Sequence, residues 1–94
     1  MTHTVEHSPE ETQYQLKIDG ERVGLIDYDL DGDVIHLTHT EIDKSDRTKG
    51  LGSELVRETL DQIRDETSYR VVADCPFVAH FVSENTEYQA LLER

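Results

Sequence analysis

The chain has little cysteine and no long apolar run, and each shortage excludes a class of protein. Cys75 is the only cysteine among 94 residues, which excludes an internal disulfide and a cysteine-rich zinc site. The longest unbroken apolar runs are three residues long, whereas a helix needs about 20 to cross a bilayer. The first residues are not a basic segment followed by an apolar stretch, so we expect no secretory signal. We therefore expect a cytoplasmic protein without a membrane partner.

Basic residues are also scarce, with 9 lysines and arginines against 21 aspartates and glutamates, so the net charge is -12 at pH 7. Nucleic acids bind mainly through lysines and arginines opposite their phosphates, so we expect no DNA or RNA partner. The acidic residues are spread through every segment, which favours a solvated surface of the kind found in high-salt cytoplasm. The alternative, an acidic funnel for a cationic substrate, requires a spatial clustering that a sequence does not show.

Three segments of alternating polar and apolar residues predict a β-meander. The alternation runs from Tyr14 to Ile18 and again along 23–30 and 34–42. The dipeptides Asp19-Gly20 and Asp31-Gly32 separate these segments, and Asp-Gly pairs favour the positive φ angles of tight hairpin turns. We therefore predict three successive antiparallel strands.

The hydrophobic period changes after the third predicted strand. Apolar residues then recur at helical spacing, which predicts a helix from Leu51 to near Glu66. A short β-rich run covers 69–73, Pro76 marks the start of a second helix, and a last helical turn or two covers 88–92. This order predicts an α+β fold with a mixed, mainly antiparallel sheet and helices packed on it.

The start of the chain differs from the rest. Residues 1–11 show no periodicity and include Pro9, so we expect a flexible lead-in there. A chain of this size can bury one small core but not two independent ones. We therefore assign residues 12–94 to a single domain.

The strongest local signal is the segment R-T-K-G-L-G at 47–52, which joins a predicted strand to a predicted helix. Glycines let the backbone approach a ligand, and the unpaired N–H groups of a first helical turn attract anions. The segment lacks the Lys-Ser/Thr ending of a P-loop, and Leu55 occupies the place of the last glycine in a dinucleotide fingerprint. We interpret it as an anion-binding loop, with a plain tight turn as the simpler alternative.

Together with its flanks, this segment resembles a known family. The spacing R-x-x-G-x-G at 47–52 is similar to the pyrophosphate-binding motif of the GNAT superfamily of acetyl-CoA-dependent N-acetyltransferases. H-T-E at 39–41 and C-P-F at 75–77 resemble motifs of its short stand-alone branch. The likeness runs from about Tyr14 to Leu92 and implies a minimal GNAT-like fold. Residues 84–88 depart from the His-Pro-Glu-Tyr usual in that branch, so we assign them no ligand role.

The resemblance implies acetyl-CoA as co-substrate, and we expect no metal. The loop and first helical turn would hold the CoA pyrophosphate, and the backbone of the preceding strand would bind the pantetheine arm at Glu41 and Ile42. The thioester would then lie in the gap between that strand and the strand that ends at Cys75. The residues assigned to the pyrophosphate are Thr48, Lys49, Gly50, Leu51, Gly52 and Ser53, and Arg47 joins them as a cofactor-binding residue that adds positive charge.

Cys75 has two interpretations. Pro76 suits the first position of a helix, whose dipole would favour the Cys75 thiolate and make it a nucleophile that carries the acetyl group. Alternatively, Cys75 is a small apolar residue packed beside the ligand, because free cysteines are often buried. Most GNAT enzymes transfer the acetyl group directly, so the covalent route is a hypothesis.

His39 and Glu41 are two residues apart on a predicted strand, so both side chains point to one face and Thr40 points to the other. Acetyl transfer needs a neutral amine, and either side chain could accept its proton. Both could equally be ordinary surface residues. Tyr88 could protonate the departing thiolate, as a tyrosine does in many GNAT enzymes, but we favour a core position for it.

The segment 27–38 imitates the first half of a calcium-binding EF-hand loop, with Asp27, Asp29, Asp31 and Gly32 at the expected positions. The twelfth position is a threonine, and the flanks alternate as strands do. We therefore predict a hairpin and no structural calcium.

These features lead to one function and one alternative. We expect an acetyl-CoA-dependent N-acetyltransferase that acts on a primary amine, with Cys75, Glu41 and His39 as catalytic candidates. The alternative is a CoA-binding or thiol redox module in which Cys75 forms a mixed disulfide with CoA. The acceptor and the oligomeric state are not determined by the sequence.

Overall fold

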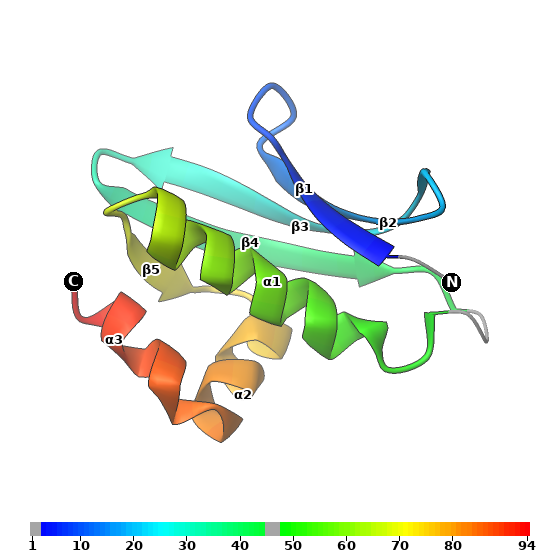
Figure 1. Cartoon of the computed structure of the whole chain (residues 1–94). Helices are drawn as coiled ribbons and strands as arrows, with labels where there is room; N and C mark the ends of the chain where they lie inside the picture. The colour runs from blue at the N-terminus through cyan, green and yellow to red at the C-terminus, as the bar shows by residue number, and fades with distance from the viewer. Residues whose placement is uncertain (1–2, 45–47) are drawn as a thin grey trace.

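The computed structural model describes residues 3–44 and 48–94 as one curved sheet with helices packed against it (Figure 1). In chain order the elements are β1 (His3–Ser8), β2 (Gln13–Ile18), β3 (Glu21–Asp31), β4 (Val34–Ile42), α1 (Leu51–Glu66), β5 (Arg70–Ala73), α2 (Pro76–Glu84), a 3-10 turn (Thr86–Tyr88) and α3 (Gln89–Leu92). The predicted α+β class and its strands and helices over 13–92 are confirmed.

The five strands lie in sequence order across the sheet. The first four pair antiparallel, and β5 joins β4 in parallel after the crossover through α1. α1 packs against β1, β2 and β3, while α2 packs against β4 and β5 and also contacts α1. The helices therefore cover one face of the sheet (Figure 1), and no described helix covers the other.

Strand β1 corrects the expectation of a lead-in over 1–11. Residues 3–8 pair in register with β2, from His3 opposite Ile18 to Ser8 opposite Gln13. Val5 is the one apolar residue of this strand, so no alternation marked it in the sequence. Tertiary contacts stabilise it instead: the Gln62 side chain of α1 donates a hydrogen bond to the Val5 carbonyl at 2.7 Å.

The core lies between the sheet and α1. The buried face of α1 consists of Leu55, Val56, Thr59, Leu60 and Ile63, as its helical spacing predicts. These side chains meet the inward residues of the strands, among them Leu16, Ile26 and Leu37, each of which is essentially inaccessible to solvent. This packing fixes the position of α1, and with it the start of the helix that carries the predicted anion-binding loop.

A β-bulge in β4 reverses the alternation of its side chains. Asp27 pairs with His39 and Tyr28 pairs with Leu37, so Thr38 is an extra residue with no partner in β3. Ile35 and Leu37 point into the core before the bulge. After it the inward residues are Thr40 and Ile42, and His39 and Glu41 lie on the open face.

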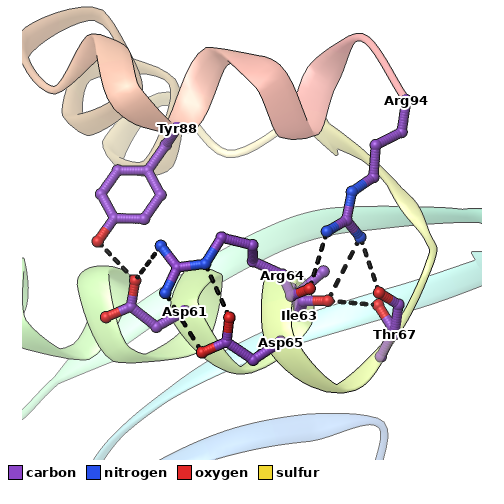
Figure 2. Close-up of polar contacts among 7 residues, drawn as sticks. All are labelled: Asp61, Ile63, Arg64, Asp65, Thr67, Tyr88 and Arg94. Carbon is purple, nitrogen blue, oxygen red and sulfur yellow. Dashed lines mark hydrogen bonds and ion pairs between the residues drawn. The ribbon is translucent and has the colours of Figure 1, made fainter.

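The C-terminal segment is tied to the second half of α1 (Figure 2). The buried Tyr88 hydroxyl donates a hydrogen bond to Asp61 at 2.7 Å, and the guanidinium of Arg94 donates to the carbonyls of Arg64 and Thr67 at 2.9 Å. Arg94 thus satisfies carbonyl groups that the end of a helix leaves unpaired. Tyr88 is a core residue, as we favoured.

No described helix has the length and apolar character needed to cross a bilayer.

Candidate functional site

Strands β4 and β5 separate partway along their length. They pair only from Val34 opposite Arg70 to Leu37 opposite Ala73, and the Cys75 N–H then donates to the Leu37 carbonyl at 2.9 Å. The chain turns into α2 at Pro76. Residues 38–42 of β4 therefore have β3 on one edge and no described strand on the other, which leaves a gap in the sheet with backbone hydrogen-bonding groups along it.

Cys75 lies at the closed end of this gap and is buried, with 5% of its surface exposed. Its Sγ is 3.3 Å from the Thr40 hydroxyl. Burial raises the pKa of the Cys75 thiol, but hydrogen bonds from the Thr40 hydroxyl and from backbone N–H groups of Thr40 and the first turn of α2 outweigh it. The pKa therefore lies below its ordinary value, which favours the thiolate form more than in an ordinary cysteine.

The pair His39 and Glu41 lies on the other face of the sheet. Their side chains contact each other, with His39 Nε2 3.1 Å from Glu41 Oε1, and both are more than half exposed. They share one face, as predicted, but Cys75 is on the opposite face beside Thr40. The three catalytic candidates therefore do not meet in one pocket; they border the same gap from its two sides.

The predicted anion-binding loop ends at a helix start with the required geometry. Gly50 has a φ of +80°, a left-handed conformation that glycine adopts without strain, and α1 begins at Leu51. The N–H groups of Leu51, Gly52 and Ser53 belong to the first helical turn, where no intrahelical carbonyl is available. The Thr48 hydroxyl donates to the Asp43 carbonyl, which ties the loop to the end of β4. Arg47 lies outside the described residues.

Gly52 has a steric role that its place in the motif did not reveal. A Cβ at this position would lie 3.0 Å from Cζ of Phe77, so the absence of a side chain lets the Phe77 ring rest against the start of α1. Phe77 is 45% exposed, which is unusual for a large apolar side chain beside a helix start. The two helix starts thus meet at Gly52 and Phe77.

Two cavities adjoin this region. One of about 540 Å³ lies at the start of β3 and the end of β4 and includes Thr40, Glu41 and Ile42 in its lining. The second, about 240 Å³, lies between α1 and α2 and includes Ser53 and Phe77. The residues predicted for the pantetheine arm therefore border a real hollow.

Sequence reasoning missed Thr40 as a partner of Cys75. It placed Thr40 on the face opposite His39 and Glu41, which is correct, but it did not place Cys75 there. The side of the sheet that Cys75 occupies depends on the crossover through α1, for which the sequence has no local signal.

Two groups of residues of the types that bind metal ions can be located in the structure. Residues 27–38, which match the first half of an EF-hand loop in sequence, form the β3–β4 hairpin, as predicted. Gly32 in its turn has a φ of +60°. Side-chain atoms of His3, Glu54 and Glu58 lie within 4.8 Å of one another on β1 and α1, and the His3 ring is hydrogen-bonded to Glu58 at 3.0 Å. The sequence did not anticipate this cluster, because β1 was not predicted.

Comparisons with known proteins agree with this geometry. A sequence model described as GCN5-related N-acetyl-transferase matches residues 13–91. The fold is similar to the solution structure of a GCN5-like protein from Staphylococcus aureus that is designated a proposed N-acetyltransferase, with a TM-score of 0.69 and 19% sequence identity. That match covers 94% of this chain and 85% of the other. No curated protein sequence matches significantly. The family model spans most of the chain, so the chain belongs to the GCN5-related N-acetyltransferase family.

Proposed function

We propose that this domain transfers an acetyl group from acetyl-CoA to a primary amine. The observation that carries the proposal is the gap along residues 38–42 of β4, which has a helix N-terminus near its open end and a polarised thiol at its closed end. An extended thioester arm requires backbone hydrogen-bonding groups along its length, and an attached diphosphate requires N–H donors. Both are present in one continuous region.

Different segments of the chain would bind different parts of the coenzyme. The N–H groups of Leu51, Gly52 and Ser53 would hold the pyrophosphate of the coenzyme, because the start of a helix attracts phosphate. Lys49, exposed beside them, adds positive charge to a chain of net charge -12. The backbone of Glu41 and Ile42 would hold the pantetheine arm. Acetyl-CoA supplies the activated acyl group.

The amine would approach from the open face of the sheet. His39 and Glu41 are exposed there in mutual contact, at the same segment of β4 that borders the gap. Either side chain can take the proton from the amine, and Glu41 orients the imidazole of His39. The neutral amine then attacks the thioester carbonyl and forms the carbon–nitrogen bond, the carbon–sulfur bond breaks, and the second proton that the nitrogen loses neutralises the departing CoA thiolate. Positioning two reactants on opposite sides of one gap accounts for the catalysis.

Cys75 supports a second candidate. The lowered pKa of its thiol and its hydrogen bond with Thr40 favour a nucleophile, which could accept the acetyl group before the amine does. A module that only binds CoA, and forms a mixed disulfide through Cys75 when an external oxidant removes two electrons, would use the same geometry. The burial of Cys75 limits the reactants that can reach its thiol to small or extended ones.

The proposal is tested by separating binding from turnover. Acetyl-CoA is expected to raise the melting temperature, and free CoA is expected to accumulate only when an amine is present. A panel of lysine, a polyamine and a peptide with a free N-terminus, followed by mass spectrometry, identifies the acceptor class. Acetylated Cys75 without any amine would favour the covalent route. Stabilisation without turnover on any amine would favour the binding module, and no stabilisation would refute both.

Thr40 provides a further test of the thiol. Replacing Thr40 with valine removes the hydroxyl that lowers the pKa of Cys75, so the pKa is expected to rise and the thiolate fraction at neutral pH to fall. Because only the thiolate reacts, the pH profile of iodoacetamide alkylation should move to higher pH. Thr40→Ser is the matched control, since it keeps the hydroxyl. An unchanged profile in Thr40→Val would show that this contact does not stabilise the thiolate.

The remaining expectations from the sequence stay predictions. These are the cytoplasmic location, the absence of nucleic-acid and membrane partners, and the adaptation of the acidic surface to high salt.

A further inference from the structure

Three side chains of the types that bind metal ions converge where β1 packs against α1. Glu54 and Glu58 are four residues apart on α1, so they lie on the same face of the helix, and His3 reaches them from β1. One ligand atom from each of the three lies within 4.8 Å of the other two, and the His3 Nε2 is 3.0 Å from a carboxylate oxygen of Glu58. The cluster is separate from the gap and from the loop that the proposed transfer uses.

This cluster differs from the other contacts between histidines and carboxylates in the chain. Those contacts bring one carboxylate to each ring, in the pairs His36–Asp74, His39–Glu41 and His80–Glu84. At His3 two carboxylates meet one imidazole, and all three side chains are partly buried. Across residues 3–44 and 48–94 it is the one group of three such side chains close enough to share an ion. Two neighbouring carboxylates repel each other, and a cation bound between them removes that repulsion.

The existing contacts of these side chains leave ligand atoms available. The Nε of Arg57 is 3.7 Å from Oε1 of Glu54, which is a long ion pair, and the carboxylate has a second oxygen. In the contact between His3 and Glu58 one proton lies between the ring and the carboxylate, and a metal ion takes its place when it binds both groups. Partly exposed ion pairs contribute little stability, so an ion can replace them at small cost.

The chemistry of the three ligands indicates which ion fits. An imidazole nitrogen with two carboxylate oxygens suits Zn²⁺ and similar first-row ions, whereas Mg²⁺ and Ca²⁺ prefer oxygen ligands alone. Zinc binds nitrogen and carboxylate oxygen at about 2.0–2.2 Å, so its ligands lie at most about 4.4 Å apart. The three atoms are already nearly that close, and rotation of the flexible glutamate side chains closes the difference.

We propose that His3, Glu54 and Glu58 bind a divalent transition-metal ion of the Zn²⁺ type, with water completing its coordination. The ion joins β1, which has one apolar residue of its own, to the helix that packs on the core. Because the three ligands come together only in the folded chain, binding of the ion stabilises the fold. β1 precedes the segment 13–91 that the family model matches, so His3 lies outside the family's sequence pattern. The site does not depend on acetyl transfer.

Calorimetric titration of the chain, without an affinity tag, with Zn²⁺ alone tests this site. Zn²⁺ at about 100 times its Kd is expected to raise the melting temperature by about 10 °C or more. Co²⁺ should bind in the same place and give visible absorption bands that excess Zn²⁺ removes. Mg²⁺ should bind at least about tenfold more weakly than Zn²⁺, because it does not favour the imidazole.

Glu58→Gln separates a metal ligand from a structural contact. Glutamine keeps the size of the side chain and still accepts a hydrogen bond from His3, so the melting temperature without metal should change little. The affinity for Zn²⁺ should fall at least about tenfold, because even residues that only support a metal ligand cost about 10–100-fold when replaced. Glu54→Gln should have the same effect on affinity. Asp74→Asn is the matched control, since Asp74 contacts His36 at 3.0 Å but belongs to no such cluster among the described residues.

Three outcomes would overturn the site. If the unmodified chain binds no Zn²⁺, the three side chains form only an ion pair and its neighbour. If the two glutamine variants bind Zn²⁺ as tightly as the unmodified chain, the ion lies elsewhere. If Mg²⁺ binds as tightly as Zn²⁺, the acidic surface attracts cations without a site that uses the imidazole.

Discussion

Replacing Glu41 with glutamine is expected to lower kcat for amine acetylation about 100-fold or more, as the loss of a general base typically does. The change keeps the size of the side chain and its position on the open face, but it removes the charge that contacts His39 at 3.1 Å. Because the predicted coenzyme contact of Glu41 is through its backbone, the Kd for acetyl-CoA should change little. Steady-state kinetics together with calorimetry separate the two effects.

Asp29→Asn is the matched control for this change. Asp29 is an exposed carboxylate that the alternation of β3 places on the same face of the sheet, opposite His36 rather than at the gap. Its replacement should leave kcat unchanged. His39→Gln identifies which member of the pair takes the proton. If the Glu41 and His39 variants both keep full activity while Cys75→Ala loses it, proton transfer by this pair is wrong and the covalent route is favoured.

Replacing Leu60 with alanine is expected to destabilise the fold by about 2–5 kcal/mol, the usual cost of truncating a buried leucine. Leu60 is fully buried where α1 packs on the sheet. Small domains have unfolding free energies of about 5–15 kcal/mol, so this is a large share of the total. The melting temperature should fall by about 10 °C or more, given roughly 4–8 °C per kcal/mol for a domain of this size.

Leu30→Ala is the control, because it removes the same side-chain atoms at an exposed position. Leu30 is 48% exposed at the end of β3, so its truncation leaves no closed cavity. We expect a change within about 0.5 kcal/mol, as for most surface substitutions. Urea unfolding of both variants gives the comparison. Similar losses for Leu60 and Leu30 would contradict the position of α1 over the core.

The strands and helices with a clear hydrophobic period were predictable. β2, β3 and β4 alternate, and α1 and α2 repeat at helical spacing, because most of their apolar residues pack into one shared core. β1 was not predictable, since it contains one apolar residue and is held by pairing with β2 and by the hydrogen bond from Gln62. Local sequence does not carry a signal for contacts of that kind.

The candidate site was predictable in its parts but not in its arrangement. Gly50 was identified from its motif, and its positive φ agrees with the reason for choosing glycine. The contact of Cys75 with Thr40 was not predicted, and neither was the cavity between α1 and α2. Both depend on residues that are distant in the sequence and meet only through packing of α2 against β4 and α1.

The sequence by itself determined the family motif, the acidic net charge, the order of the elements from β2 onward and the need for glycine at the helix start. These are local properties of residue type and spacing. Only the tertiary structure decided that the His39–Glu41 pair and the Cys75 thiol lie on opposite faces of one gap. The bulge at Thr38 and the parallel pairing of β5 produce that arrangement, and both are set by hydrogen bonds between strands that the spacing of residues along one strand does not specify.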